Sequence, residues 1–213
     1  RTANHFHDQV LLRPWTGWHT DITGAINPPM ASILRGVVVP PYGGDTQFTS
    51  LMAAYNALSP ALKGFVDTLR GIHRNGSPAG VQADKEYEEK IRNRLLETEH
   101  PLVRVHPETG ERALYAGPNH LKSIAGLTPR DSQVLLELLW EHRVRPEFTV
   151  RFKWEPGSIA FCDIRAVCHR APRDIFDSDF DREFYRTTLV GDVPVGVDGK
   201  PSVSLSGEPI GPA

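Results

Sequence analysis

FTVRFKWEPGSIAFC, residues 148–162, carries two strand signals joined by a turn. Apolar and polar side chains alternate from Phe148 to Trp154, and this period of two is typical of a half-buried β-strand. Glu155-Pro156-Gly157 favours a turn, and residues 158–162 are typical of a second strand. The segment therefore indicates a β-rich fold.

Further strand patterns occur on both sides of this segment. Residues 31–39 have the apolar content of a buried strand and are followed by the turn signal Pro40-Pro41-Tyr42-Gly43-Gly44. We expect residues 45–49 to return beside them as the second strand of a hairpin. Residues 102–105 and 113–115 predict another hairpin, and residues 184–190 predict the last strand.

Helices are expected between these strands. Residues 50–58 and 60–70 predict two helices, the second with Ser59 as its N-cap and a proline at its first position. Thr128-Pro129-Arg130-Asp131 is a strong helix start. The apolar face of that helix is expected to contain Val134, Leu135, Leu138 and Leu139.

This order of elements predicts a mainly β fold with helical insertions, either a sandwich or a barrel. A charged helix exposed to solvent is also expected at residues 84–97. Residues 1–195 are interpreted as one domain, which suits a chain of 213 residues. Residues 196–213 are rich in Gly, Pro, Ser and Val, and we expect them to form an extended C-terminal tail over the surface.

Charge and composition exclude several classes of protein. The formal net charge of −2 and the pI of about 6.5 show no basic excess, so nucleic acid is not an expected partner. The longest apolar stretches have the length of a strand, so neither a transmembrane helix nor a membrane partner is expected. Cys162 and Cys168 lie too far apart along an extended strand to pair, and so few cysteines favour a cytoplasmic location.

Trp18-His19-Thr20-Asp21 contains the first candidate for chemistry. In an extended segment, residues two apart point to the same side, so the imidazole of His19 and the carboxylate of Asp21 can bind one metal ion. A second histidine would complete the 2-His-1-carboxylate set of non-haem Fe(II) sites. His106-Pro107-Glu108 is a competing pair of the same form, for which a solvated position beside the hairpin turn is the alternative.

Residues late in the chain favour the first pair. His169 could be the second histidine, and Arg182 and Arg186 follow it, in one strand if that strand covers residues 181–190. Residues four apart in a strand share one face. Two guanidinium groups facing a core would each need an anion, whereas an outward, solvated face is the alternative.

These motifs resemble the taurine dioxygenase family of Fe(II)- and 2-oxoglutarate-dependent dioxygenases, from about Trp18 to about Pro194. The similarity is greatest to the branch that acts on taurine and alkyl sulfate esters. Several short motifs in a fixed order make the match specific. They are WHTD at 18–21, GGDT at 43–46, HPLV at 100–103, HPETG at 106–110, and the segments 163–169 and 182–192.

The resemblance implies a double-stranded β-helix (jelly-roll) core and an iron-dependent oxidoreductase that uses 2-oxoglutarate and O2. It implies His19, Asp21 and His169 as the Fe(II) ligands, with Thr46 and Arg182 holding the 2-oxoglutarate. The implied reaction, in sulfur metabolism, is hydroxylation of a small anionic substrate, an alkyl sulfonate or sulfate ester, with release of succinate and CO2.

The expected substrate contacts are Arg186 and Ile22, from the resemblance, together with Trp15 and Asn119. Trp15 stands where the taurine enzymes have a polar contact, so its apolar ring favours a substrate larger than taurine. Asn119, next to His120, would edge the pocket. A carboxylate such as a phenoxyalkanoate or a biosynthetic intermediate is the alternative substrate, and homo-oligomerisation stays open.

Besides Trp15, the chain departs from the family pattern at two places. Only eighteen residues precede His19, so the N-terminal region of the family is expected to be missing. Cys162 and Ile164 replace the usual Trp and Asn around Asp163. Two other functions remain open for these residues, a jelly-roll binding protein without catalysis and a zinc hydrolase. The complete ligand set with Arg182 favours the dioxygenase over the first, and the second lacks a nearby general base.

Overall fold

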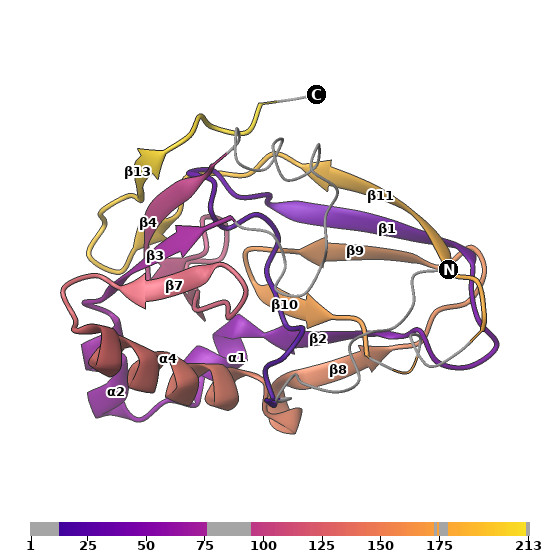
Figure 1. Ribbon diagram of the computed structural model, residues 1–213, viewed down its shortest axis with the longest axis horizontal. Coiled ribbons are helices and arrows are strands. Elements are labelled where there is room, and N and C mark those ends of the chain that lie inside the picture. The colour runs from indigo at the N-terminus through magenta and orange to yellow at the C-terminus, as the bar shows by residue number, and fades with distance from the viewer. Residues whose placement is uncertain (1–12, 76–94, 173, 175–178, 212–213) are drawn as a thin grey trace.

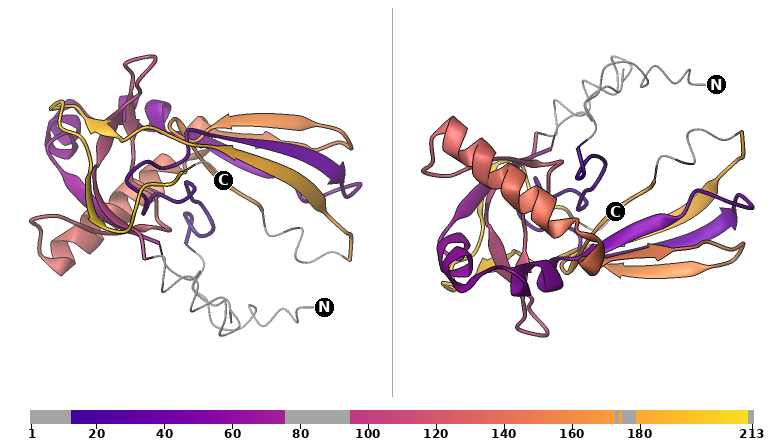
Figure 2. Two further views of the ribbon diagram at one scale, coloured as in Figure 1. Left: turned by 90° about the horizontal axis from the view of Figure 1, so that it is seen from above. Right: turned by 90° about the horizontal axis from the view of Figure 1, so that it is seen from below.

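The computed structural model describes residues 13–75, 95–172, 174 and 179–211. Two three-stranded antiparallel sheets, in the orders β11-β1-β9 and β10-β2-β8, form one half of the molecule (Figure 1). The first contains β1 (Ala31–Val38), β9 (Ile159–Asp163) and β11 (Glu183–Leu189). The second contains β2 (Thr46–Ser50), β8 (Thr149–Phe152) and β10 (Val167–Arg170). Figure 2 shows the two sheets as separate layers.

Apolar side chains from both sheets fill the space between these layers. Leu34 and Phe184 come from the first sheet, Phe48 and Phe152 come from the second, and all four pack around the buried Trp154. Along the chain the strands switch repeatedly from one layer to the other. Antiparallel strands arranged in this way form a jelly roll, so the predicted fold class is confirmed.

The other half of the molecule is a four-stranded sheet in the order β13-β4-β3-β7, with helices packed beside it (Figure 1). Its strands are β3 (Arg70–Arg74), β4 (Glu97–Pro101), β7 (Leu121–Ile124) and β13 (Val203–Ser206). A smaller sheet joins β5 (Val103–Val105), β6 (Arg112–Leu114) and β12 (Val195–Gly196). The helices are α1 (Leu51–Asn56), α2 (Pro60–Val66), α4 (Pro129–Arg143) and the 3-10 helix η1 (Pro146–Phe148).

Local signals in the sequence are confirmed where short-range geometry controls them. The Ser59 hydroxyl accepts a hydrogen bond from the Leu62 N–H at the start of α2, and the Thr128 hydroxyl accepts one from the Asp131 N–H at the start of α4. The predicted hairpin near residue 108 forms between β5 and β6. Within the described ranges, no helix combines the length and the apolar character that a membrane span requires.

The predicted hairpin between residues 31–39 and 45–49 is wrong. Both strands form, but β1 pairs with β9 and β11, whereas β2 pairs with β8 and β10. Pro40 and Pro41 have no N–H to donate to a ladder, so they end β1. Gly43 and Gly44 have φ angles of 74° and 67°, which glycine adopts without strain, and after them the chain enters the opposite layer.

Only part of the face predicted for helix α4 is buried, because Leu139 is buried and Leu135 packs against the core while the other two residues are exposed. Val134 is 61% exposed and Leu138 49%, whereas the helix buries Ser132, Leu136, Leu139, Trp140 and Arg143. The helix carries apolar residues on two sides, and only contact with the rest of the fold selects one of them. The end of α2 also differs, because the helix stops at Val66 and Arg70 already belongs to β3.

Three further expectations concern the strand at residues 148–154, the helix at residues 84–97 and the tail from residue 196. Val150 is 64% exposed and residue 148 lies in η1, so the inward alternation predicted for this strand is wrong at its first half. Most of the helix expected at residues 84–97 lies outside the described residues, and Glu97 begins β4. The segment from residue 196 is extended, as expected, but it also contributes β13, which pairs with β4.

Candidate metal centre and cosubstrate pocket

Three side chains meet beside strand β10. The ligand atoms of His19, Asp21 and His169 all lie within 4.8 Å of one another. Oδ1 of Asp21 is 3.6 Å from Nε2 of His19 and 3.8 Å from Nε2 of His169. The structure therefore brings together the His-x-Asp pair and the distal histidine that the sequence singled out.

The backbone places the two histidines next to each other. His19 and His169 form an antiparallel bridge in which the N–H of each residue donates to the carbonyl of the other at 2.9 Å. Their ring centroids are 4.3 Å apart. Because the bridge uses only main-chain groups, both imidazoles stay free to point at Asp21.

The protonation of both rings suits metal binding. Nδ1 of His19 lies 3.0 Å from the carbonyl oxygen of Gly17, which can only accept, so Nδ1 carries the hydrogen and the Nε2 lone pair faces Asp21. Burial, and after it the charge of the neighbouring His19, lower the pKa of His169 to about 4. A neutral imidazole is the form that binds a metal ion.

The two carboxylate oxygens of Asp21 have different neighbours: Oδ1 faces the two histidines, and Oδ2 faces Ser32 and Arg186. Oδ2 accepts a hydrogen bond from the Ser32 hydroxyl on β1 at 3.2 Å, and Nη1 of Arg186 lies 3.9 Å from the same oxygen. Outer contacts of this kind fix the orientation of a ligating carboxylate. Oδ1 is thus turned towards Nε2 of both rings.

The residue after Asp21 has an unusual backbone conformation. Ile22 has a φ angle of +47°, and it is the one non-glycine residue with positive φ in the described ranges. A β-branched side chain is strained there by about 1–3 kcal/mol, and such strain persists only where the surroundings hold it. The turn that it begins includes a hydrogen bond from the Ala25 N–H to the Ile22 carbonyl at 3.1 Å.

Two imidazole nitrogens and one carboxylate oxygen on one side of a common point match the facial triad of non-haem Fe(II) sites. Such a triad leaves metal positions open for other ligands. The donor set, the tautomer of His19 and the neutral His169 all fit a divalent transition metal. The residues present therefore fit the iron that the sequence resemblance implies.

Arg182 and Thr46 each contact one ring of the aromatic pair Phe184 and Trp154. Nε of Arg182 donates to the Gly44 carbonyl at 3.0 Å, and its guanidinium stacks 4.1 Å from the centroid of the Phe184 ring. The indole N–H of Trp154 donates to Oγ1 of Thr46 at 2.9 Å, and Trp154 packs edge-on against Phe184. Trp154 and Phe184 thus connect the two residues predicted to hold 2-oxoglutarate.

The predicted substrate residues occupy two places. Trp15 and Asn119 line a cavity of about 210 Å³, together with Thr16, Gly17, Trp18 and Pro118. This cavity adjoins the centre, because Gly17 is the residue that orients His19. Arg186 is 57% exposed and reaches Asp21 from β11, so it is neither a buried cation nor a purely outward one. Ile22 is half-buried behind Asp21.

In the competing pair, both ring nitrogens of His106 are hydrogen-bonded to other groups of the protein. His106 is 3% exposed, with Nε2 bonded to Oδ2 of Asp163 at 3.0 Å. Its Nδ1 accepts hydrogen bonds from the backbone N–H groups of Glu108 and Thr109, and the Glu108 side chain bonds Arg165. The expected solvated position is therefore wrong for His106, because these bonds anchor the β5–β6 turn to the end of β9.

Both cysteines are free and buried, as expected. Burial raises the pKa of Cys162 to about 11, with a further contribution from Asp21, so it is a neutral thiol. Burial also lowers the pKa of His120 to about 4, and its ring contacts Asn119 at 3.3 Å.

Sequence reasoning assigned no role to three residues that contact Asp21 or the segments next to the metal ligands. Ser32 bonds Asp21, Arg170 bonds Gln47 and stacks over Trp18, and His100 bonds the backbone just after Asp21. Two local signals were present, the position of Arg170 directly after His169 and the place of His100 in the HPLV motif, but neither gave a role. Ser32 lies outside the quoted motifs, so only the fold reveals its contact with Asp21.

Comparison with known proteins agrees with this centre. The family model described as "Taurine catabolism dioxygenase TauD, TfdA family" matches residues 2–188. An alpha-ketoglutarate-dependent sulfate ester dioxygenase of Pseudomonas putida is 44% identical over 86% of this chain and 62% of its own length. An alkylsulfatase of Acinetobacter baylyi is 38% identical, over 85% of this chain and 59% of its own length.

Other relatives have different named substrates. A 2,4-dichlorophenoxyacetate dioxygenase of Cupriavidus pinatubonensis is 35% identical over 84% of this chain and 61% of its own length. The solved structure of a taurine dioxygenase from Burkholderia xenovorans is 65% identical, with a TM-score of 0.84 over 94% of this chain and 66% of that one. The chain thus spans about three fifths of the length of these three curated relatives. On these matches, the chain belongs to the TauD, TfdA family of dioxygenases.

Proposed function

We propose that this protein is an Fe(II)- and 2-oxoglutarate-dependent dioxygenase that hydroxylates a small anionic substrate and releases succinate and CO2. The convergence of His19, Asp21 and His169 carries the proposal. When bound to these residues, iron would supply the oxidising chemistry with 2-oxoglutarate and O2. The protein itself would bind, orient and shield the reactants.

Arg182 and Thr46 have hydrogen-bonding capacity for the far carboxylate of 2-oxoglutarate. A guanidinium has five N–H donors, and the Gly44 carbonyl uses only Nε. Oγ1 of Thr46 accepts from the Trp154 indole, so the hydroxyl hydrogen of Thr46 remains to be donated. A carboxylate accepts both kinds of hydrogen bond, and a guanidinium offers it matching charge and geometry.

Burial makes this pair selective for an anion. Thr46 is 6% exposed, and burial lowers the pKa of Arg182 because it penalises the charged guanidinium. A half-buried cation gains most from a partner of opposite charge. We therefore assign Arg182 and Thr46 to the cosubstrate.

The substrate is proposed to be an alkyl sulfate ester or sulfonate. Arg186 lies beside Asp21 and offers a cation at the metal, and Trp15 offers apolar area in the adjoining cavity. An anionic head with an alkyl chain suits these two features. The sulfate ester dioxygenase and the alkylsulfatase among the relatives support this choice.

A carboxylate substrate is the second candidate. The 35% identity to a 2,4-dichlorophenoxyacetate dioxygenase supports it, and the guanidinium of Arg186 would pair with a carboxylate as readily as with a sulfate. The two candidates share the reaction and differ only in the substrate.

An anaerobic absorption experiment tests the proposed function. Fe(II) and 2-oxoglutarate added to the protein without O2 should produce a visible charge-transfer band, and His169→Ala should not show it. Succinate release with alkyl sulfates, alkyl sulfonates and phenoxyacetates should then identify the substrate class. A wild-type protein that gives no band and no succinate would refute the proposal.

A further inference from the structure

The turn that follows Asp21 is held from the inside by strand β4. Nε2 of His100 lies 2.9 Å from the Thr23 carbonyl and 3.1 Å from the Ala25 carbonyl, and both bonds are buried. The Thr98 hydroxyl donates to the Gly24 carbonyl at 2.8 Å. Three successive carbonyls of the turn are thus bound by two alternate residues of one strand, which point to the same face of the sheet.

Strand β3 and its end complete this support. Nδ1 of His73 lies 2.9 Å from the Thr23 hydroxyl, and the Asn75 side chain accepts from the Gly24 N–H at 3.1 Å. Gly24 has no space for a side chain, because a Cβ there would lie 2.6 Å from the Asn75 nitrogen. These contacts fix residues 23–25, which directly follow Asp21 and the positive φ of Ile22.

His100 also bonds to the C-terminal segment, residues 194–210. Its Nδ1 lies 2.6 Å from Oγ of Ser202, whose N–H donates to the Pro194 carbonyl at 2.8 Å. Carbonyl oxygens only accept, so Nε2 carries the hydrogen and Nδ1 is an acceptor. The single hydrogen of the Ser202 hydroxyl has two acceptors within reach, Nδ1 of His100 at 2.6 Å and the Pro194 carbonyl at 2.9 Å. One neutral ring therefore joins the C-terminal segment to the turn beside Asp21.

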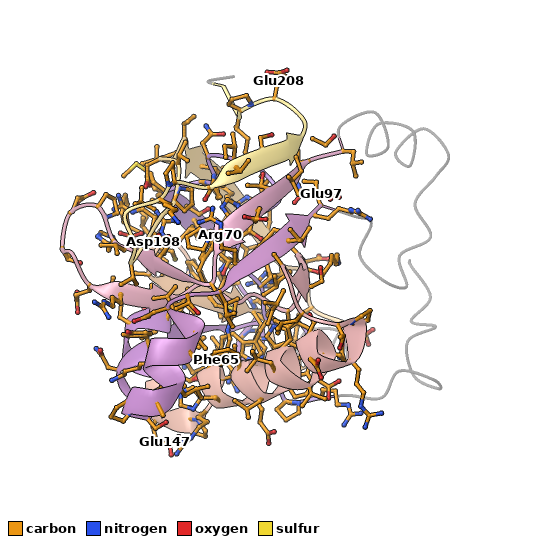
Figure 3. All side chains as sticks on the ribbon, turned by 90° about the vertical axis from the view of Figure 1, so that its left-hand side faces the viewer. Phe65, Arg70, Glu97, Glu147, Asp198 and Glu208 are labelled. Atoms are coloured by element: carbon orange, nitrogen blue, oxygen red, sulfur yellow. The ribbon has the colours of Figure 1, made fainter. Side chains whose placement is uncertain are left out.

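Other contacts fasten the C-terminal segment to the same structure. β13 pairs with β4, and Nη2 of Arg70 donates to the Pro201 carbonyl at 2.7 Å on the outer face, which Figure 3 shows with Arg70 labelled. Asn27 and Ile210 exchange two hydrogen bonds, from the side-chain amide to the carbonyl at 2.8 Å and from the Ile210 N–H to the amide oxygen at 2.7 Å. The segment therefore contacts the 23–27 region directly at Asn27 and is linked to Thr23 through His100.

We propose that His100 is a positioning residue that couples the C-terminal segment 194–210 to the metal ligand Asp21 through the turn 22–25. The inference rests on the proposed role of Asp21 as a ligand. His100 does not contact the metal, and Ser202 is one step further from it. Both act by restricting the turn, so their loss lets Asp21 sample directions that do not meet the two histidines.

The test measures Mn(II) affinity, which requires no turnover. Mn(II) titration by calorimetry is compared for wild type, His100→Gln, Ser202→Ala and Thr98→Val. Outer contacts of metal ligands typically contribute about tenfold or more to affinity, so each variant should bind Mn(II) about tenfold more weakly. Thr98→Ser, which keeps the hydroxyl, should restore the affinity lost in Thr98→Val. Ser204→Ala on exposed β13 is the matched control, because its hydroxyl bonds only the Gly207 carbonyl.

The melting temperature with and without Mn(II) separates positioning from simple stabilisation. Positioning predicts a smaller Mn(II)-induced rise in the variants. A lower melting temperature with an unchanged Mn(II) dissociation constant would overturn the inference and leave the proposed function intact. A wild-type protein that does not bind Mn(II) would overturn both. If His100→Gln does not fold, Ser202→Ala and the Thr98 pair decide the question.

Discussion

His19 and His169 are joined by two backbone hydrogen bonds of 2.9 Å, each from the N–H of one residue to the carbonyl of the other. This bridge makes the candidate metal centre a consequence of strand pairing. His19 is placed on the edge of β10, and the ring of His169 then lies 4.3 Å from its own. A change that slides the segment of His19 by one residue would turn its imidazole to the other side.

The first prediction concerns the metal ligands. His19→Ala should abolish stoichiometric Fe(II) or Mn(II) binding, because two of three ligands do not hold the ion in a facial site. His106→Ala is the control, since the bonds of His106 go to Asp163 and to its own turn. Metal content and calorimetry measure the effect. Normal binding by the His19 variant, with loss in the His106 variant, would show that the wrong pair was chosen.

The second prediction concerns the cosubstrate. Arg182→Ala should weaken 2-oxoglutarate binding about tenfold or more, because a charge-assisted contact contributes about 1.5–3 kcal/mol and its loss leaves the carboxylate unpaired. Thr46→Val should have a smaller effect, since it removes only one neutral donor. Titration of 2-oxoglutarate into the Mn(II) form measures both. Arg145→Ala, at an exposed ion pair with Glu147, should change nothing.

The third prediction concerns the substrate anion. Arg186→Ala should raise the Michaelis constant for an active alkyl sulfate and leave the affinity for 2-oxoglutarate close to that of wild type. The exposure of Arg186, 57%, makes its contribution smaller than that of a buried cation, so a change of about tenfold is expected. Succinate release over a range of substrate concentrations gives the result. Turnover only with neutral compounds would contradict the anion-binding role.

The fourth prediction concerns Arg170, which holds the turn before His19. Its Nε donates to Gln47 at 2.7 Å, its guanidinium stacks 4.9 Å from the Trp18 ring centroid, and Nη1 reaches the Pro14 and Thr16 carbonyls at 3.4 Å. Arg170→Ala should loosen the wall of the cavity that contains Trp15, and raise the Michaelis constant for substrate more than it lowers kcat. Arg170→Lys should recover part of the effect, because it keeps the charge over Trp18 but loses the fork of donors.

The fifth prediction is a loss of stability in acid. Burial lowers the pKa of His100 to about 3 and holds the pKa of His73 well below its ordinary value of 6.5. Between the lowered pKa values of the folded protein and 6.5, the unfolded chain therefore binds more protons than the folded one. The free energy of unfolding consequently falls as the pH drops below 6.5. Each histidine can contribute a slope of up to about 1.4 kcal/mol per pH unit.

Urea unfolding between pH 7.5 and 4.5 measures this slope in the metal-free protein. His100→Gln should be less stable than wild type at pH 7.5 but should lose less stability on acidification. An identical pH dependence in the two proteins would mean that His100 does not titrate as its burial requires.

Short-range features of this protein were readable from the sequence alone. Ser59 and Thr128 cap their helices through hydrogen bonds to residues three positions ahead, and the β5–β6 hairpin closes over a few residues. The choice of His19 and Asp21 depended on a spacing of two in an extended segment, which local geometry also sets. Several motifs in a fixed order then indicated the family, which the comparisons confirm.

Only the tertiary structure decided how these pieces meet. β1 and β2 are neighbours in the sequence but lie in different layers, because their edges pair with strands more than a hundred residues away. The buried face of α4 was likewise selected by its neighbours. The HPLV motif contains His100 but does not show its partners, and Ser202 belongs to no motif. The two residues meet behind Asp21 because β13 pairs with β4. Hydrogen bonds between distant segments depend on the whole fold, so a reading of local spacing could not show them.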